Sequence, residues 1–250
     1  FHLIHTSSEE TFGMMQMRCI ESIFYHHPLA TVLFYVKNMT DAPVKYIMQA
    51  GYDLQVIKYD IVDHLYQLER DETVDVSIVR NFTSRIKDFA SDDKGHWHVN
   101  ESDLLRLIVL YLHGGIYLDT DTVVVKRLDG LPPNTIGLQD PRRKMFNNAV
   151  LLLERKNEFT IACLKEFLTN YNNRKWGANG PFLITRIYFS DLGRWNINAV
   201  AKTHFEFFGW MRIGYLCYDN TDDQMVLDNL YQIRQQAYVV HMNNKMGHVI

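Results

Sequence analysis

The sequence predicts a single α/β domain, residues 1–250, in which a mainly parallel sheet is flanked by helices. Two observations favour this class. Strand-like and helix-like segments alternate along the first part of the chain, the pattern of parallel strands joined by helical crossovers. The composition is that of an ordinary globular protein, with 47% hydrophobic and 22% charged residues. We therefore expect one domain with a substantial core and no disulfide scaffold.

The first elements follow from local patterns. Residues 1–5 are apolar and predict an opening strand. The polar residues 6–8 can cap an amphipathic helix over residues 9–25. Residues 31–36 are rich in β-branched and aromatic side chains and predict a second strand. A helix over residues 41–50, ended by Gly51, then leads to a third strand at 54–59.

The middle of the chain is more polar. Residues 75–89 are expected to be helical, and Asn100 can cap a helix that runs to Leu112. Asp103 would be the capping-box partner of Asn100. Gly114 and Gly115 end that helix. The remaining expected elements are strands at 116–118 and 123–125, near Ile136 and at 149–153, helices at 158–171 and from Pro181 to about Tyr188, and a strand at 237–241.

Charge and cysteine usage narrow the function classes. The net charge is −3 and the basic residues are scattered, so we expect no nucleic-acid partner. The longest apolar run, residues 107–112, is too short to cross a bilayer. Since the chain begins at Phe1, we expect any membrane anchor to lie in a segment missing from it. The three cysteines form no metal-binding spacing and predict buried thiols, with one disulfide as the alternative.

The segment IYLDTDT, residues 116–122, is the strongest functional signal. A buried strand ends there in two carboxylates, Asp119 and Asp121. Loops at the carboxyl ends of strands are where ligands bind in open α/β folds. Two oxygen ligands suit Mg²⁺ or Mn²⁺, which could bridge to a substrate diphosphate. The plain alternative is a surface turn with two solvated aspartates.

The preceding helix offers a second pair of polar residues. Asp103 and Arg106 are three residues apart and share one helix face. If that face looks towards Asp119 and Asp121, Arg106 can bind phosphate or sugar hydroxyls with its planar guanidinium. The plain alternative is a local ion pair between these two side chains.

These segments resemble the DXD region of glycosyltransferase family 32, within its α1,4-galactosyltransferase and α1,4-N-acetylglucosaminyltransferase branch. The resemblance continues in the same order through most of the chain. The similar segments are SDLLR (102–106), LYLHGGIYLDTD (110–121), FNNA (146–149), ERKNEF (154–159), WGANGP (176–181), LITR (183–186), YVVH (238–241) and NK (244–245).

The resemblance implies a GT-A fold, which is Rossmann-like, and transfer of a hexose or N-acetylhexosamine from a UDP-sugar to a hydroxyl of a glycan or glycolipid. It implies retention of configuration, Mn²⁺ (or Mg²⁺) as cofactor, and a type II membrane protein of the Golgi lumen. A nucleotide-sugar half would span about residues 1–125 and an acceptor half about residues 126–250.

The implied site residues fall into three groups. The catalytic residues would be Asp119, Asp121 and Arg106. The metal ligands would be Asp119, Asp121 and His241. The donor-binding residues would be His5, Thr6, Asp103, Arg106, Asp119, Thr120, Asn147, Gly180 and Lys245. Several of these have plain structural alternatives: His241 as a strand-end histidine, Lys245 as a surface lysine, Asn147 as a turn residue and Gly180 as a helix start.

Two positions depart from the family pattern. The family's usual Asn-Gly-Ala is Asn-Asn-Ala here, so Asn148 replaces the glycine. The usual Trp-Asn-Lys is Asn-Asn-Lys here, so Asn243 replaces the tryptophan. Both lie where the donor sugar and the acceptor are expected to be sensed. These two departures therefore bear on the identity of the donor sugar and of the acceptor more than on the reaction class.

Two other functions fit parts of the sequence. The DxDxT pattern after an apolar strand also occurs in haloacid-dehalogenase phosphatases, in which Asp119 would be the nucleophile. That motif normally ends the first strand of its core, whereas a long array of strands and helices precedes it here. The chain could also be a catalytically silent module that binds sugar nucleotides on the same fold.

Overall fold

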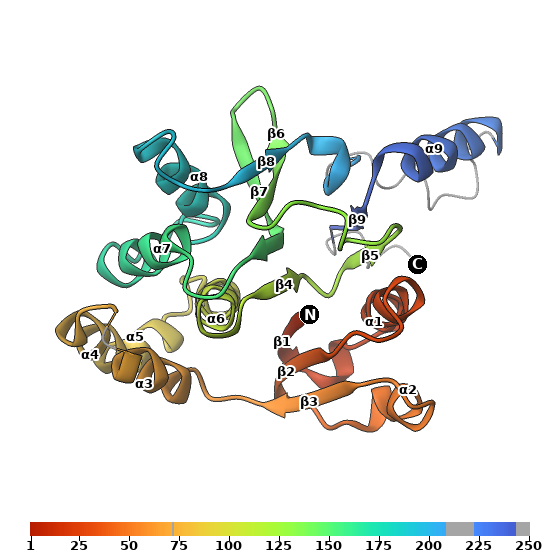
Figure 1. The fold of residues 1–250 in the computed structure, drawn as a ribbon. Coiled ribbons are helices and arrows are strands. Elements are labelled where there is room, and N and C mark those ends of the chain that lie inside the picture. The colour runs from red at the N-terminus through yellow and green to blue at the C-terminus, as the bar shows by residue number, and fades with distance from the viewer. Residues whose placement is uncertain (72, 209–222, 244–250) are drawn as a thin grey trace.

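The computed structural model describes residues 1–71, 73–208 and 223–243, and Figure 1 shows their arrangement. The strands are β1 (His2–Ser8), β2 (Val32–Asn38), β3 (Leu54–Lys58), β4 (Gly115–Leu118), β5 (Thr122–Val124), β6 (Thr135–Asp140), β7 (Met145–Leu153), β8 (Asn198–Val200) and β9 (Val239–His241). The helices are α1 (Met14–His26), α2 (Lys45–Gln49), α3 (Ile61–Asp71), α4 (Val76–Ser84), α5 (Ile86–Ala90), α6 (Trp97–His113), α7 (Glu158–Thr169), α8 (Pro181–Ser190) and α9 (Asp223–Gln236). Short 3₁₀ turns lie at η1 (Glu9–Thr11), η2 (Ala42–Val44) and η3 (Lys202–His204).

Seven strands form one sheet in the order β3-β2-β1-β4-β7-β6-β8. The pairs β3–β2, β2–β1, β1–β4 and β6–β8 are parallel, whereas β7 runs antiparallel to both β4 and β6. The expected mainly parallel sheet is therefore confirmed, with β7 as its antiparallel member. A separate two-stranded sheet pairs β5 with β9.

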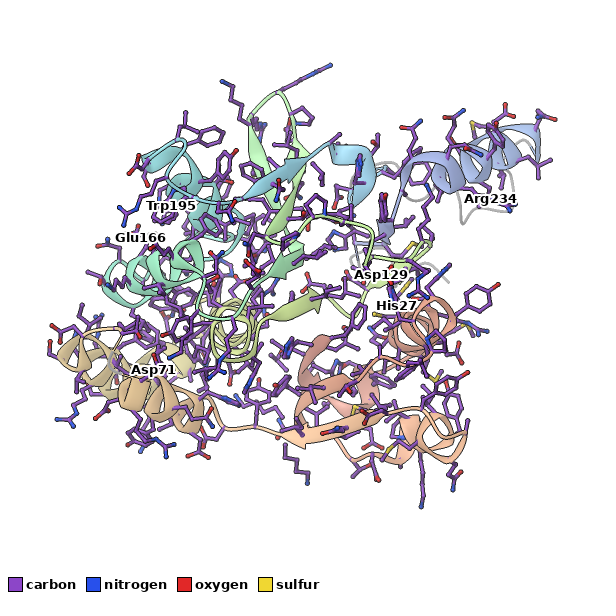
Figure 2. All side chains as sticks on the ribbon, in the orientation of Figure 1. His27, Asp71, Asp129, Glu166, Trp195 and Arg234 are labelled. Carbon is purple, nitrogen blue, oxygen red and sulfur yellow. The ribbon has the colours of Figure 1, made fainter. Side chains whose placement is uncertain are left out.

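Two apolar clusters cover the two faces of the sheet. Alternation along a strand sends successive side chains to opposite faces. Leu3 of β1 accordingly joins the cluster that includes α1, whereas Ile4 joins the cluster formed with α3 to α8. The buried helix α6 lies directly against the sheet, with α3, α4, α5 and α7 outside it (Figure 1). Figure 2 shows Asp71, at the end of α3, beside α6, where it accepts a hydrogen bond from the hydroxyl of Tyr111.

The expected helix cap at residues 6–8 is wrong, because β1 continues to Ser8. Glu9 instead uses its carboxylate to accept hydrogen bonds from the backbone and hydroxyl of Thr40. Helix α1 begins only at Met14, where the side chain of Gln16 accepts a hydrogen bond from the backbone of Gly13.

The expected cap at Asn100 is also wrong. Helix α6 begins at Trp97, and Asn100 lies inside it, 1% exposed, where it donates a hydrogen bond to the hydroxyl of Tyr171. Asp103 is not a capping partner but a buried residue of the same helix. Pure sequence spacing could not distinguish a cap from a buried polar pair.

Other boundaries differ less. The expected helix at 41–50 is instead the 3₁₀ turn η2, with Pro43 in its first turn, followed by the short helix α2. The expected helix at 75–89 is two helices, α4 and α5, and Asp75 caps the first. Helices α3 and α9 were not expected. Cys19 and Cys163 are buried free thiols, while Cys217 lies outside the described residues.

No helix within the described ranges combines the length and the apolar character needed to cross a bilayer.

Candidate active site

The two aspartates of the DXD segment lie in a tight turn between β4 and β5. The backbone of Asp119 donates a hydrogen bond to the carbonyl of Ala149 on β7, which continues the sheet pairing beyond Leu118. The backbone and hydroxyl of Thr122 both donate to the carbonyl of Asp119, at 3.1 and 2.8 Å. These bonds close the turn, so that Asp119 and Asp121 lie side by side.

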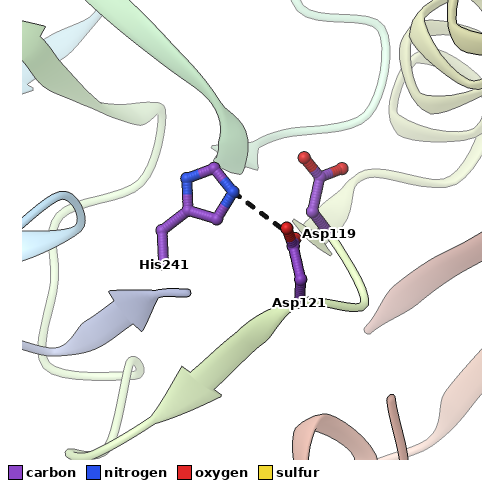
Figure 3. Close-up of side chains that lie close together, drawn as sticks. All are labelled: Asp119, Asp121 and His241. Carbon is purple, nitrogen blue, oxygen red and sulfur yellow. Dashed lines mark ion pairs between the residues drawn. The ribbon is translucent and has the colours of Figure 1, made fainter. Parts of the chain in front are cut away.

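Strand β9 brings His241 to this turn from the far end of the chain. His241 is in register with Thr122 of β5, and the backbone of Met242 donates to the carbonyl of Asp121. The imidazole Nε2 of His241 lies 3.4 Å from Oδ1 of Asp121. Figure 3 shows these two side chains facing each other, with Asp119 beside them.

The three side chains form a potential cation site. One ligand atom from each of Asp119, Asp121 and His241 lies within 4.8 Å of the others. Burial alone would lower the pKa of His241, but hydrogen bonds and negative charge from Asp121 and Glu206 outweigh it and hold that pKa well above its ordinary value. Two carboxylates and an imidazole are a donor set that fits a divalent cation.

Arg106 of α6 lies directly behind the turn. Its guanidinium is 3.2 Å from Asp119 and 3.1 Å from Asp103, and it donates to the carbonyl of Asn148 at 2.6 Å. It also stacks over the ring of Tyr117, whose hydroxyl donates to Asp119. Arg106 is therefore more than the i,i+3 partner of Asp103: it connects α6, β4 and β7.

Asp103 is 4% exposed, and burial raises its pKa to about 6 even though the charge of Arg106 acts in the opposite direction. Its Oδ1 accepts a hydrogen bond from the side chain of Asn148 at 2.7 Å. Gly180, at the start of α8, packs against this pair, since a Cβ there would lie 2.6 Å from Oδ2 of Asp103. The donor-binding roles of Asp103 and Gly180 stay predictions.

A cleft of about 680 Å³ opens beside the turn. Its lining residues are Ile4, His5, Thr6, Ser7, Glu10, Thr11, Gln16, His98, Val99, Ser102, Arg106, Tyr117, Asp119, Thr120 and Asp121. His5, Thr6 and Thr120 are thus brought together with both aspartates. Burial lowers the pKa of His5, whose Nε2 lies 3.1 Å from the carbonyl of Ser8.

The structure describes Asn147 but not Lys245. Asn147 is 1% exposed and donates to Glu206, a residue that the sequence reasoning missed. Glu206 stands in no recognised motif, so only its position beside His241 draws attention to it. Lys245 lies outside the described residues.

The plain structural alternatives fit this geometry poorly. The side chains of Asp119 and Asp121 are 27% and 14% exposed, so neither is a fully solvated turn residue. The ion pair between Asp103 and Arg106 exists, but it is one part of a larger network that includes Asp119.

Known proteins agree with the sequence resemblance. Residues 13–141 match the family described as the glycosyltransferase sugar-binding region containing the DXD motif, and residues 152–249 match the alpha 1,4-glycosyltransferase conserved region. Lactosylceramide 4-alpha-galactosyltransferase of Mus musculus is 44% identical over 41% of this chain and 27% of its own length. The Homo sapiens protein of that name is 30% identical over 74% of this chain and 50% of its own length.

Human alpha-1,4-N-acetylglucosaminyltransferase is 27% identical over 67% of this chain and 47% of its own length. The chain thus spans about half or less of the length of these relatives.

Among solved structures, PaToxG glycosyltransferase covers 98% of this chain and 76% of its own, with a TM-score of 0.55 and 16% identity. An active-site mutant of LgtC covers 96% of this chain and 86% of its own, with a TM-score of 0.50 and 12% identity. These likenesses concern the fold alone, and they confirm the expected GT-A fold. The chain belongs to the DXD-containing glycosyltransferases, in the branch with the alpha 1,4-glycosyltransferase conserved region.

Proposed function

We propose that this chain transfers a hexose or N-acetylhexosamine from a UDP-sugar to a hydroxyl of a glycan or glycolipid, with retention of configuration. The observation that carries the proposal is the cluster of Asp119, Asp121 and His241 at the edge of a 680 Å³ cleft. A cleft of this volume has the size of ordinary small-ligand sites, about 300–1,000 Å³.

The metal site would hold Mn²⁺ in preference to Mg²⁺. Carboxylate oxygens suit both ions, but imidazole nitrogen is a ligand typical of transition metals, so the mixed set of Asp119, Asp121 and His241 favours Mn²⁺. A divalent cation there would offset the charge that develops on the departing diphosphate. Arg106 and Lys245 would add fixed positive charge to the same end of the donor.

Donor binding is proposed for residues 1–125 and acceptor binding for residues 126–250. Every lining residue of the cleft belongs to the first range, which supports this division. His5, Thr6 and Thr120 would contact the nucleotide, and Asp103 would be held beside the sugar by Asn148 and Gly180. Asn147 would act on the sugar indirectly, since its side chain is engaged with Glu206 and the backbone of β7.

Retention would proceed by attack on the same face of the sugar, within an ion pair. A double displacement needs a carboxylate free to attack the anomeric carbon. Asp103 is paired with Arg106 and Asn148, and Glu206 is fully buried among hydrogen-bond donors. Neither lines the cleft, so neither is placed to act as that nucleophile.

The acceptor and compartment are proposed from the relatives. Lactosylceramide 4-alpha-galactosyltransferase is named for a glycolipid acceptor. We therefore propose a glycan or glycolipid acceptor and action in the Golgi lumen, with a membrane anchor outside this chain.

The phosphatase alternative is not favoured, because the chain belongs to a glycosyltransferase family and Asp119 follows the fourth strand of the chain, not the first. The silent module is the remaining rival.

A panel of UDP-sugars with Mn²⁺ tests the proposal, with release of UDP and transfer to lactosylceramide or a glycan as readouts. We expect one sugar to be hydrolysed or transferred, and Asp119→Asn and Asp121→Asn each to lower the rate by at least about 100-fold. Binding of UDP with Mn²⁺ but no turnover of any donor would favour the silent module. Hydrolysis of p-nitrophenyl phosphate alone would favour the phosphatase.

A further inference from the structure

A fully buried carboxylate, that of Glu206, lies behind the DXD turn. Its side chain is 0% exposed. It follows the turn η3, where its backbone donates to the carbonyl of Lys202. The preceding residue, Phe205, is 0% exposed and packs so closely on Gly137 of β6 that a Cβ on that glycine would lie 2.5 Å from the ring. Glu206 is therefore held in place by a backbone hydrogen bond and by the close packing of its neighbour Phe205.

Three hydrogen-bond donors converge on this carboxylate. Its Oε2 accepts from Nδ2 of Asn147 at 2.7 Å and is 2.8 Å from Nδ1 of His241. Its Oε1 accepts from Nδ2 of Asn243 at 3.0 Å. Within the described part of the chain, the basic side chain that pairs with Glu206 is that of His241. An ionised carboxylate accepts hydrogen bonds and donates none, so Nδ1 of His241 must carry the proton.

The orientation of the Asn147 amide is fixed by the backbone. Its Oδ1 accepts from the backbone N–H groups of Ala149 and Val150, at 2.7 and 3.0 Å. Its Nδ2 must therefore point to Glu206 and cannot exchange places with Oδ1. A chain of hydrogen bonds thus runs from the backbone of β7 through Asn147 and Glu206 to His241.

The other nitrogen of His241, Nε2, is the one that lies 3.4 Å from Asp121. We propose that Glu206 is a positioning residue that keeps the proton of His241 on Nδ1, so that, when a cation between Asp119 and Asp121 displaces the proton from Nε2, the Nε2 lone pair points at that cation. This inference rests on the proposed metal-dependent function. A carboxylate behind a ligating histidine commonly fixes the ring and strengthens it as a ligand.

Replacing Glu206 by glutamine breaks the arrangement without changing the size of the side chain. If the amide oxygen faces His241, the amide nitrogen faces the donor nitrogen of Asn243. If the amide is turned round, its nitrogen faces Asn147 and Nδ1 of His241, and the proton of the ring must move to Nε2. The first arrangement costs a hydrogen bond and replaces the negative charge behind the ring by a neutral amide, which weakens the imidazole as a ligand. The second removes the lone pair from the cation site.

A double-mutant cycle on Mn²⁺ affinity tests the role. Free Mn²⁺ is followed by electron paramagnetic resonance in the wild-type chain, Glu206→Gln, His241→Ala and the double variant. We expect Glu206→Gln to weaken Mn²⁺ binding by about 10–100-fold. In the His241→Ala background the same change should alter the affinity by less than a factor of about two, because Glu206 acts through the ring.

The control is Glu166→Gln, which makes the same chemical change on α7, in the ion pair with Arg186, far from β9 (Figure 2). It should leave Mn²⁺ affinity unchanged. If the losses of Mn²⁺ affinity from the two single substitutions multiply in the double variant, or if Glu206→Gln has wild-type affinity, the positioning role of Glu206 is overturned. The metal site itself would stand. A wild-type chain that binds no Mn²⁺, or one whose affinity survives Asp121→Asn, would overturn the metal site itself.

A measurement on the wild-type chain keeps the test valid if Glu206→Gln does not fold. Nitrogen-15 spectra of histidine-labelled chain, with Mg²⁺ and UDP, report which ring nitrogen is protonated, and His241→Ala assigns the signal. We expect a proton on Nδ1 and none on Nε2. A proton on Nε2 in that state would contradict the proposal.

Discussion

Arg106 joins more of the site than any single motif suggests. It contacts two carboxylates, a main-chain carbonyl on β7 and the ring of Tyr117. Burial alone would lower the pKa of Arg106, but the neighbouring acidic groups, with Asp119 the largest contributor, together raise that pKa above its ordinary value. A planar guanidinium can make these contacts together, whereas an ammonium group offers only one compact charge. Asn148, a departure from the family pattern, is part of the same network because it donates to Asp103.

Arg106→Lys keeps the positive charge but loses the planar fork that reaches Asp103, Asp119 and the carbonyl of Asn148 together. We expect it to lower kcat/KM by about 100-fold or more and the free energy of unfolding by about 1–3 kcal/mol, because buried acceptors are left without donors. Urea unfolding and donor hydrolysis measure the two effects. If Arg106→Lys keeps both the wild-type free energy of unfolding and the wild-type kcat/KM, only the positive charge of Arg106 matters.

His2 gives a pH dependence that is independent of the active site. It is 3% exposed and sits 2.8 Å, through Nε2, from the carbonyl of Gly114, while its Nδ1 is buried without a hydrogen-bond partner. Burial lowers its pKa from 6.5 to about 4. The unfolded chain therefore takes up this proton first as the pH falls, and stability is lost from about pH 6.5 towards pH 4.

His2→Gln can still donate to the carbonyl but cannot titrate. We expect the wild-type free energy of unfolding, relative to this variant, to fall between pH 7 and pH 4.5, by at most about 3 kcal/mol. Urea unfolding at the two pH values measures it. A difference that stays constant would mean that His2 is not kept neutral by the fold.

At the scale of elements, the start of α8 meets α6 and β7 at Asp103 and Asn148. Helix α6 carries both Asp103 and Arg106 as buried residues, and Gly180 is the N-cap of α8, which begins at Pro181. Proline fits there because the first helical residue needs no hydrogen-bonded N–H. Gly180 is required for a different reason: its missing Cβ lets the start of α8 approach Asp103 and Asn148.

Gly180→Ala inserts a Cβ 2.6 Å from Asp103 and 2.8 Å from Asn148. We expect the start of α8 to shift, with a loss of stability of about 1–3 kcal/mol and a loss of donor turnover. Gly130→Ala is the matched control, since a Cβ there meets no atom within 4 Å. Equal melting temperatures for the two variants would show that the contact is relieved at no cost.

At the scale of the whole molecule, the site depends on the two-stranded sheet of β5 and β9, which brings a late segment of the chain to the DXD turn. Strand β9 pairs with β5 directly after the DXD turn, and the backbone of Tyr238 is tied to the carbonyl of His204 next to Glu206. Residues from β4, β5, β9 and the segment after η3 are thereby assembled around one point (Figure 1). A cation bound there by Asp119, Asp121 and His241 would stabilise the folded chain, because the unfolded chain does not assemble these side chains.

Mn²⁺ should therefore raise the melting temperature of the wild-type chain. At a concentration 100 times the dissociation constant the gain is about 2.7 kcal/mol, which corresponds to roughly 5–10 °C for a domain of this size. Differential scanning fluorimetry with Mn²⁺ and with EDTA measures the shift. Asp121→Asn should show little of it, and an equal shift in that variant would contradict the metal site.

The sequence by itself determined the α/β class, the order of most strands and helices, and the DXD turn, but it left open whether Arg106 faces that turn. These depend on local periodicity and on motifs whose residues are close along the chain. The tertiary structure alone decided that β7 runs antiparallel, that Asn100 is a buried residue and not a cap, and that Asn148 binds Asp103. It also decided the place of Glu206 beside His241. Such contacts join residues far apart along the chain, and only the folding of the whole sheet brings them together.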